Sequence, residues 1–146
     1  MKTIDPVVDG APSTAAGRPG PNLRLGWAVF TILLAGGFFL EAIFAGSILS
    51  GVTWARKAHA VTAMILIAST FTAGVIGFLT LRRYRHGLRL GLILVSLAAG
   101  TLVQTALGAM SAKGADLTWI HVPFGVALVS LAGLAAFAAG GIGREV

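Results

Sequence analysis

Two histidines and two other polar residues recur along this chain at nearly the same spacing. Glu41 precedes His59 by 18 residues, and Gln104 precedes His121 by 17. Imidazole nitrogens are ligands for iron and other transition metals, a carboxylate can exchange protons, and a primary amide can only form hydrogen bonds. All four residues lie in or beside long apolar stretches, where a polar or ionisable group is costly and needs a reason. The repeat therefore indicates a site built from two similar parts of the chain.

The elements that must position these residues are four long apolar stretches. They cover residues 25–49, 55–81, 88–112 and 119–141, and each exceeds the roughly 20 residues that a helix needs to cross a bilayer. Hydrophobic residues make up 56% of the chain and charged residues 11%, with a mean hydropathy of +0.89, which excludes a soluble globular protein. We predict an all-α integral membrane protein, an up-down-up-down four-helix bundle made of two similar helix pairs.

The chain before the first apolar stretch has a different composition. Residues 1–22 contain prolines and glycines without an apolar period, and we predict a disordered cytoplasmic tail there. Residues 23–146 form the predicted transmembrane domain. The first apolar stretch is too long to be the core of a cleaved signal peptide, so we expect a retained helix. The chain has no cysteine, which excludes disulfides and thiolate metal sites.

Lysine and arginine are divided unequally between the two sides of the predicted bundle. One side holds eight of them, and the other holds three, namely Arg56, Lys57 and Lys113. Because loops rich in positive charge stay in the cytoplasm, we predict a protein of the bacterial cytoplasmic membrane with both termini inside. The net charge of +6 then reflects this topology and contact with anionic lipid, and no nucleic-acid partner is expected.

Topology places the four polar residues at similar depths. Short outer loops make consecutive helices antiparallel, so the second and fourth helices run parallel. His59 and His121 then lie in the first turns of their helices, roughly 3–8 Å from the outer interface. Glu41 and Gln104 lie near the outer ends of the first and third helices, roughly 12 Å below the same surface. We expect all four residues in the outer half of the bundle.

The helix faces that carry the two histidines are rich in small residues, which leaves room between the helices. Two histidines on facing helices, with space between them, are what a haem requires. We predict one haem b near the outer face, with His59 and His121 as its iron ligands. Arg56 and Lys57 are expected to contact its propionates.

The two companions of the histidines differ in what they can do. Three roles are open for Glu41. It forms a hydrogen bond as a neutral acid, carries a proton linked to haem redox change, or contacts a quinol headgroup. Gln104 cannot titrate, and we expect it to position a histidine by an interhelical hydrogen bond or to contact the cofactor.

The run Gln104-Thr-Ala-Leu-Gly108, followed by His121 on the next span, resembles the half-unit of the haem A synthase family. The resemblance covers residues 25–141 and implies a four-helix repeat whose second and fourth helices each carry a haem-ligating histidine, here His59 and His121. The family has a glutamate shortly before the first of these histidines, whereas residues 54–59 contain no acid. The chain also corresponds to one half of the eight-span family proteins. The resemblance therefore implies a small single-repeat relative and not a haem A synthase.

Two functions of different classes follow from these observations. The first is a b-type cytochrome of an electron-transport system, with quinol as a partner, or a protein that stores or presents haem. The second is a non-catalytic four-span protein that acts in assembly, lipid interaction or transport without a cofactor, and whose histidines only tune packing. A homodimer through glycine and alanine faces, or a larger membrane redox complex, would complete an eight-span arrangement.

Overall fold

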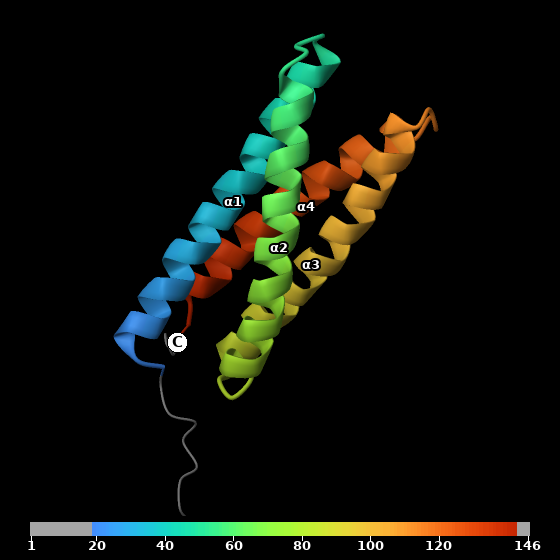
Figure 1. Ribbon diagram of the computed structural model, residues 1–146. Coiled ribbons are helices and arrows are strands. Elements are labelled where there is room, and N and C mark those ends of the chain that lie inside the picture. Colours follow the sequence, from blue (N-terminus) through green and yellow to red (C-terminus); the bar gives the residue numbers. More distant parts are fainter. Residues whose placement is uncertain (1–18, 143–146) are drawn as a thin grey trace, which may run out of the picture.

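Four helices account for nearly all of the chain that the structure describes. The computed structural model describes residues 19–142 (Figure 1), with helices α1 (Pro21–Leu49), α2 (Ala55–Leu81), α3 (Arg85–Ala112) and α4 (Thr118–Gly140). All four are long and apolar enough to cross a membrane. The described part of the chain contains no strand. The predicted all-α, four-helix membrane bundle is confirmed.

Each helix packs against two neighbours. α1 contacts α2 and α4, and α3 contacts α2 and α4, whereas within the described residues the backbones of the diagonal pairs do not pack together. Residues 19 and 142 lie at the same end as the α2–α3 turn, which we call the arginine end because Arg82 and Arg83 are located there (Figure 1). The α1–α2 and α3–α4 loops form the opposite end, which we call the histidine end.

Two helices begin earlier than the hydropathy pattern predicts. α1 begins at Pro21 instead of near residue 25, because proline lacks the N–H that would be unpaired in a first turn. Pro21 and Asn22 thus belong to the helix, while the tail predicted for the residues before position 19 lies outside the described residues. α3 begins at Arg85 instead of residue 88, directly after Tyr84, whose backbone is extended. A hydropathy pattern does not detect polar residues at the end of a helix, so it places both helix starts too late.

α1 and α3 end at the histidine end with the same backbone motif. Gly51 and Gly114 follow the last turns with φ of +85° and +97°, a left-handed conformation that glycine adopts without strain. Each glycine N–H donates to the carbonyl three residues earlier, at 3.0 Å in both cases. The next N–H donates to the carbonyl five residues earlier, at 2.9 Å after α1 and 3.1 Å after α3. The matching ends agree with two similar helix pairs.

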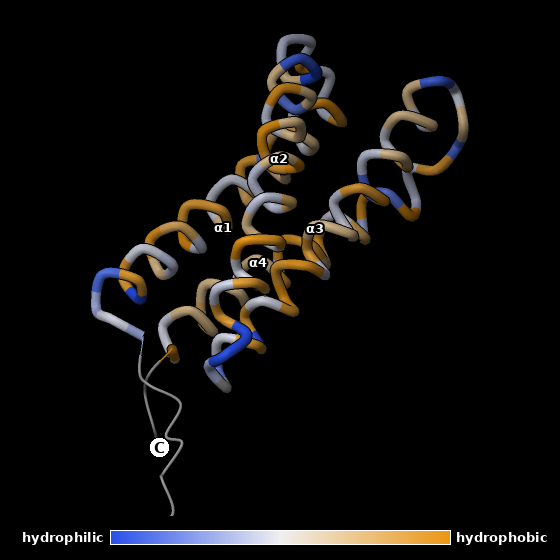
Figure 2. The backbone as a smooth tube through the Cα atoms, turned by 60° about the horizontal axis from the view of Figure 1, so that its bottom comes forward, coloured by the Kyte–Doolittle hydropathy of each residue, from blue (hydrophilic) through white to orange (hydrophobic). Residues whose placement is uncertain are grey.

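Large buried apolar side chains fill the middle and the arginine half of the bundle. They come from all four helices and include Leu34, Phe38, Leu66, Leu94, Leu97 and Leu128. The outer surface is also apolar, as expected for contact with lipid, and hydrophilic segments gather toward the two ends (Figure 2). Toward the histidine end, polar side chains replace the apolar core.

The two helix pairs separate toward the histidine end. In the arginine half, α2 and α3 approach so closely that a Cβ on Gly91 would lie 3.2 Å from Phe78 Cα. Farther along, the α1–α2 pair diverges from the α3–α4 pair, as both backbone views show (Figures 1 and 2). The first turns of α2 and α4 belong to the diverging parts of the two pairs.

Candidate functional site at the histidine end

His59 and His121 face each other across the interior of the bundle. Their ring centroids lie 6.5 Å apart, and the ring planes are nearly perpendicular, at 86°. The two residues come from α2 and α4, whose backbones are diagonal and do not pack together in the described region. The two imidazole rings therefore meet across the bundle although the backbones of their helices do not pack together.

Glu41 of α1 contacts His59 of α2. Its Oε2 lies against His59 Nδ1, and the two side chains are 13% and 26% exposed, respectively. A carboxylate beside Nδ1 favours the tautomer with the proton on that nitrogen, which leaves the lone pair of Nε2 free. Glu41 of α1 thus places a carboxylate beside His59 of α2.

Gln104 of α3 makes the corresponding interhelical contact with α4. Its Nε2 donates to the backbone carbonyl oxygen of His121 at 2.9 Å and lies 3.4 Å from His121 Nε2. This bond joins α3 to α4 at His121, as expected of an interhelical hydrogen bond that positions this histidine. Both residues need small neighbours, because a Cβ on Gly125 would lie 2.9 Å from Gln104 Nε2 and one on Gly108 would lie 3.0 Å from His121 Cε1.

Several polar atoms of this end are buried without a hydrogen-bond partner among the described residues. They are Glu41 Oε1, Gln104 Oε1, Ser111 Oγ and His121 Nδ1. Each such atom costs about 1–3 kcal/mol in a protein interior if it stays unpaired, so these atoms need water or a polar ligand as a partner. Ser111 was not among the site residues predicted from the sequence. Its position three residues after Gly108 places it on the same face of α3 and could have identified it.

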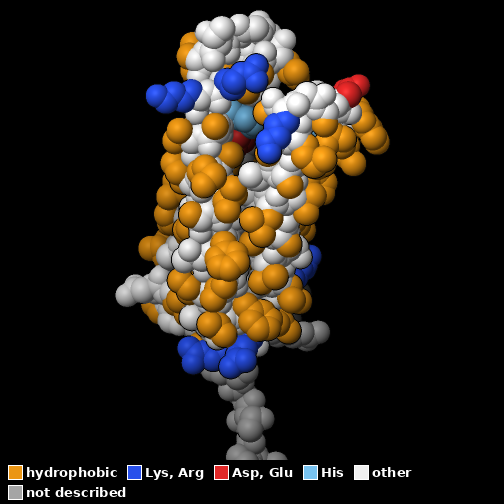
Figure 3. Space-filling view, turned by 45° about the vertical axis from the view of Figure 1, so that its right-hand side comes forward, with side chains coloured by type: hydrophobic (Ala, Val, Ile, Leu, Met, Phe, Trp, Pro, Cys, Tyr) orange, Lys and Arg blue, Asp and Glu red, His pale blue; other side chains and the backbone are white. Residues whose placement is uncertain are grey.

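Basic side chains surround the entrance to this region. The space-filling view shows histidine and acidic side chains at the bottom of a notch between two parts of the surface, with Lys and Arg side chains around it (Figure 3). Arg56 and Lys57 lie in the first turn of α2, Lys113 follows α3, and all three are exposed. The rim therefore carries positive charge that suits the carboxylates of a bound ligand.

The facing rings of His59 and His121 offer two protein ligands for one metal centre. No group of three His, Cys, Asp or Glu side chains within residues 19–142 is arranged to hold a bare metal ion. A haem, whose four ring nitrogens already hold the iron, needs only the two axial ligands. No known protein family, curated protein or solved structure matches the chain. The functional interpretation therefore depends on the residues of this site, and the resemblance to the haem A synthase family stays a prediction.

Proposed function

We propose that this protein is a membrane b-type haem protein in which His59 and His121 are the axial ligands of one haem. The observation that carries the proposal is the 6.5 Å separation of the two ring centroids. An imidazole nitrogen binds a transition metal at about 2 Å, and its ring centre lies about 1 Å behind it, so rings on opposite sides of one iron have centroids roughly 6 Å apart. The observed separation is close to this requirement.

The contacts of the two histidines support this assignment. The Glu41 carboxylate at His59 Nδ1 leaves Nε2 as the metal-binding nitrogen, an arrangement that recurs around metal-bound histidines. Gln104 fixes the α4 backbone at His121 through the carbonyl oxygen. Glu41 is then a positioning residue, and its second oxygen remains available to accept a proton or a hydrogen bond.

The surroundings of the pair are also suited to a haem. The diverging helix pairs open a notch at the histidine end, and Gly108 keeps side-chain atoms away from the His121 ring. Arg56, Lys57 and Lys113 would meet the propionates at the rim. A bound haem would supply a one-electron iron couple. Because both axial positions would be filled by protein, single-electron transfer is favoured over chemistry that needs an open iron position.

The proposal includes an orientation in the membrane. Arg24, Arg82, Arg83 and Arg89 lie at the arginine end, and Arg56, Lys57 and Lys113 lie at the other. This imbalance favours the arginine end in the bacterial cytoplasm, by the positive-inside rule. The haem would then be near the outer face of the membrane.

The optical spectrum of the purified protein tests the proposal. We expect a Soret band and a sharp alpha band after reduction, and loss of most haem from His59→Ala and from His121→Ala. His86→Ala is the matched control, because His86 is exposed in the first turn of α3 at the arginine end. Equal haem content in all three variants would favour the alternative of a four-span protein that acts without a cofactor.

A further inference from the structure

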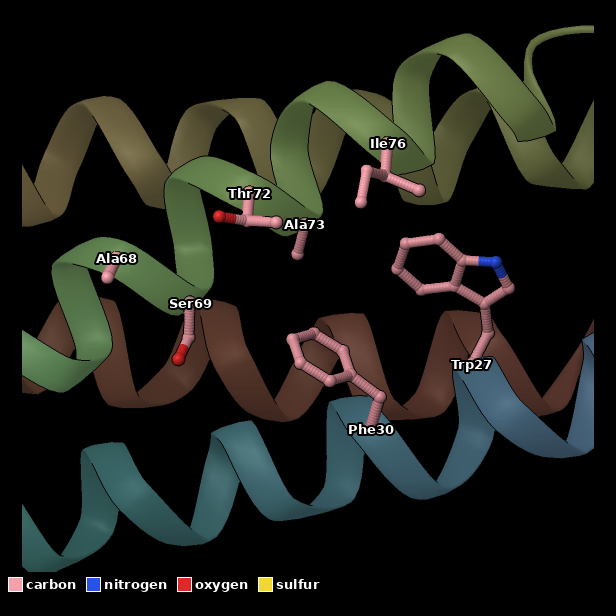
Figure 4. Close-up of a pocket in the computed structure, with 7 residues that line it drawn as sticks. All are labelled: Trp27, Phe30, Ala68, Ser69, Thr72, Ala73 and Ile76. Carbon is pink, nitrogen blue, oxygen red and sulfur yellow. The ribbon is translucent and has the colours of Figure 1, made fainter.

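A second hollow lies on the side of the bundle, away from the histidines. Its volume is about 410 Å³, and it is lined by Trp27 and Phe30 of α1 and by Ala68, Ser69, Thr72, Ala73 and Ile76 of α2. The close-up shows Ala73 and Ile76 of α2 opposite the two aromatic rings of α1, with Ala68, Ser69 and Thr72 farther along α2 (Figure 4). Because Ala68, Thr72 and Ile76 are exposed on the outer surface, the hollow opens toward lipid.

The hollow extends from the middle of the bundle toward the arginine end. Ser69 lies 14 residues after Ala55 and 12 residues before Leu81, hence about 21 Å and about 18 Å from the two ends of α2. Ser69 therefore lies near the centre of the hydrocarbon layer, where water is not available to satisfy polar groups. Trp27, six residues after Pro21, and Ile76, five residues before Leu81, lie within about 9 Å of the arginine end.

Two hydroxyl groups of the hollow lack hydrogen-bond partners. Thr70, which lies between them in sequence, donates to Leu66 O at 2.7 Å, as hydroxyls in membrane helices commonly do. Within the described residues, the Ser69 and Thr72 hydroxyls make no such bond. The opposite wall is an edge-to-face pair formed by Trp27 and Phe30, with ring centroids 5.9 Å apart. The hollow thus combines an aromatic wall with two hydroxyl groups that lie farther along α2.

We propose that this hollow binds the ring of an isoprenoid quinone. A quinone ring is flat and apolar enough to pack against Trp27 and Phe30, and its carbonyl oxygens accept hydrogen bonds from Ser69 and Thr72. The volume is within the range of about 300–1,000 Å³ that is usual for small-molecule sites with few polar groups. The lateral opening leaves a path for the isoprenoid tail into the lipid.

Other membrane molecules fit the hollow less well. An acyl chain has no acceptor for the two hydroxyls, and the ester carbonyls of phospholipids lie at the headgroup level, far from Ser69. The site is independent of the haem proposal, because it shares no residue with the histidine end. A failure of one proposal leaves the other intact.

Trp27 provides a direct test, because it lines the hollow whereas Trp54 and Trp119 are exposed at the histidine end. In a Trp54→Phe, Trp119→Phe protein in lipid nanodiscs, a benzoquinone with a decyl tail should quench Trp27 fluorescence saturably.

We expect Ser69→Ala and Thr72→Val each to weaken the apparent affinity three- to tenfold. Ala68→Leu fills the hollow from an exposed position and should abolish saturation. Ser96→Ala, which removes an exposed hydroxyl of α3, is the control and should bind as before. Haem absorbance is recorded on the same samples, so that quenching by the quinone is separated from quenching by haem.

Three results would overturn the proposal. The first is quenching that rises linearly with the quinone concentration, which indicates partition into lipid alone. The second is equal affinity in Ser69→Ala, Thr72→Val and the Ser96→Ala control. The third is quenching by phospholipids with brominated acyl chains that the quinone does not relieve, which assigns the hollow to an acyl chain. Circular dichroism of each variant confirms that the helices are intact.

Discussion

Gly108 offers a sharp test of how His121 is positioned. A Cβ at this position would lie 3.0 Å from Cε1, 3.6 Å from Nε2 and 3.7 Å from Nδ1 of the His121 ring. Non-bonded carbon atoms pack best at about 3.5–4.0 Å, so Gly108→Ala must move the ring by about 0.5–1 Å. Metal–ligand distances in a functional site tolerate only about 0.2 Å. The substitution therefore displaces a proposed iron ligand by several times this tolerance.

We expect Gly108→Ala to weaken haem binding by about 10–100-fold, the range typical for lost support around a metal ligand, or about 1.4–2.8 kcal/mol. Stability should change less, because alanine favours a helix over glycine by up to about 1 kcal/mol. The assay is titration of the haem-free protein with haem, followed at the Soret band. Gly36→Ala is the matched control, since a Cβ there meets nothing within 4 Å. Equal affinities in the two variants would refute the reasoning.

Three further predictions concern other contacts. Glu41→Ala should weaken haem binding by about 10–100-fold. Glu41→Gln keeps an acceptor for His59 Nδ1 and should retain most of the affinity. The titration with haem measures both variants. Gln104→Leu removes the bond to the His121 carbonyl and should lower stability by about 0.6–1.7 kcal/mol in reversible detergent unfolding, and an unchanged stability would contradict this. Gly91→Leu forces α2 and α3 apart and should cost about 1–3 kcal/mol in the same assay, whereas Gly133→Leu, at an open position, should cost less.

The architecture was predictable from sequence because membrane spanning imposes few solutions. The length and apolarity of the four stretches dictate four helices, and short loops dictate antiparallel neighbours. The starts of α1 and α3 were less accurate, because helix ends at the arginine end are polar and hydropathy does not register them. Pro21 was a local signal for the true start of α1.

The candidate site was predictable only in part. The repeated spacing indicated that His59 and His121 share a depth, and the structure brings their rings together. The contact between Glu41 and His59 could not be derived, because it depends on the rotation of α1 about its axis and on its offset from α2. The same holds for the lateral hollow, whose two walls come from stretches about 40 residues apart in the sequence.

The spin state of the ferric haem tests the central claim most directly, because it reports whether two strong axial ligands are bound to one iron. Electron paramagnetic resonance of the oxidised protein should show a low-spin haem at one per chain. His59→Ala and His121→Ala should each convert any remaining haem to high spin, while His86→Ala leaves the signal unchanged. A high-spin haem in the unsubstituted protein, or a low-spin signal that survives either of the first two substitutions, would contradict ligation by His59 and His121.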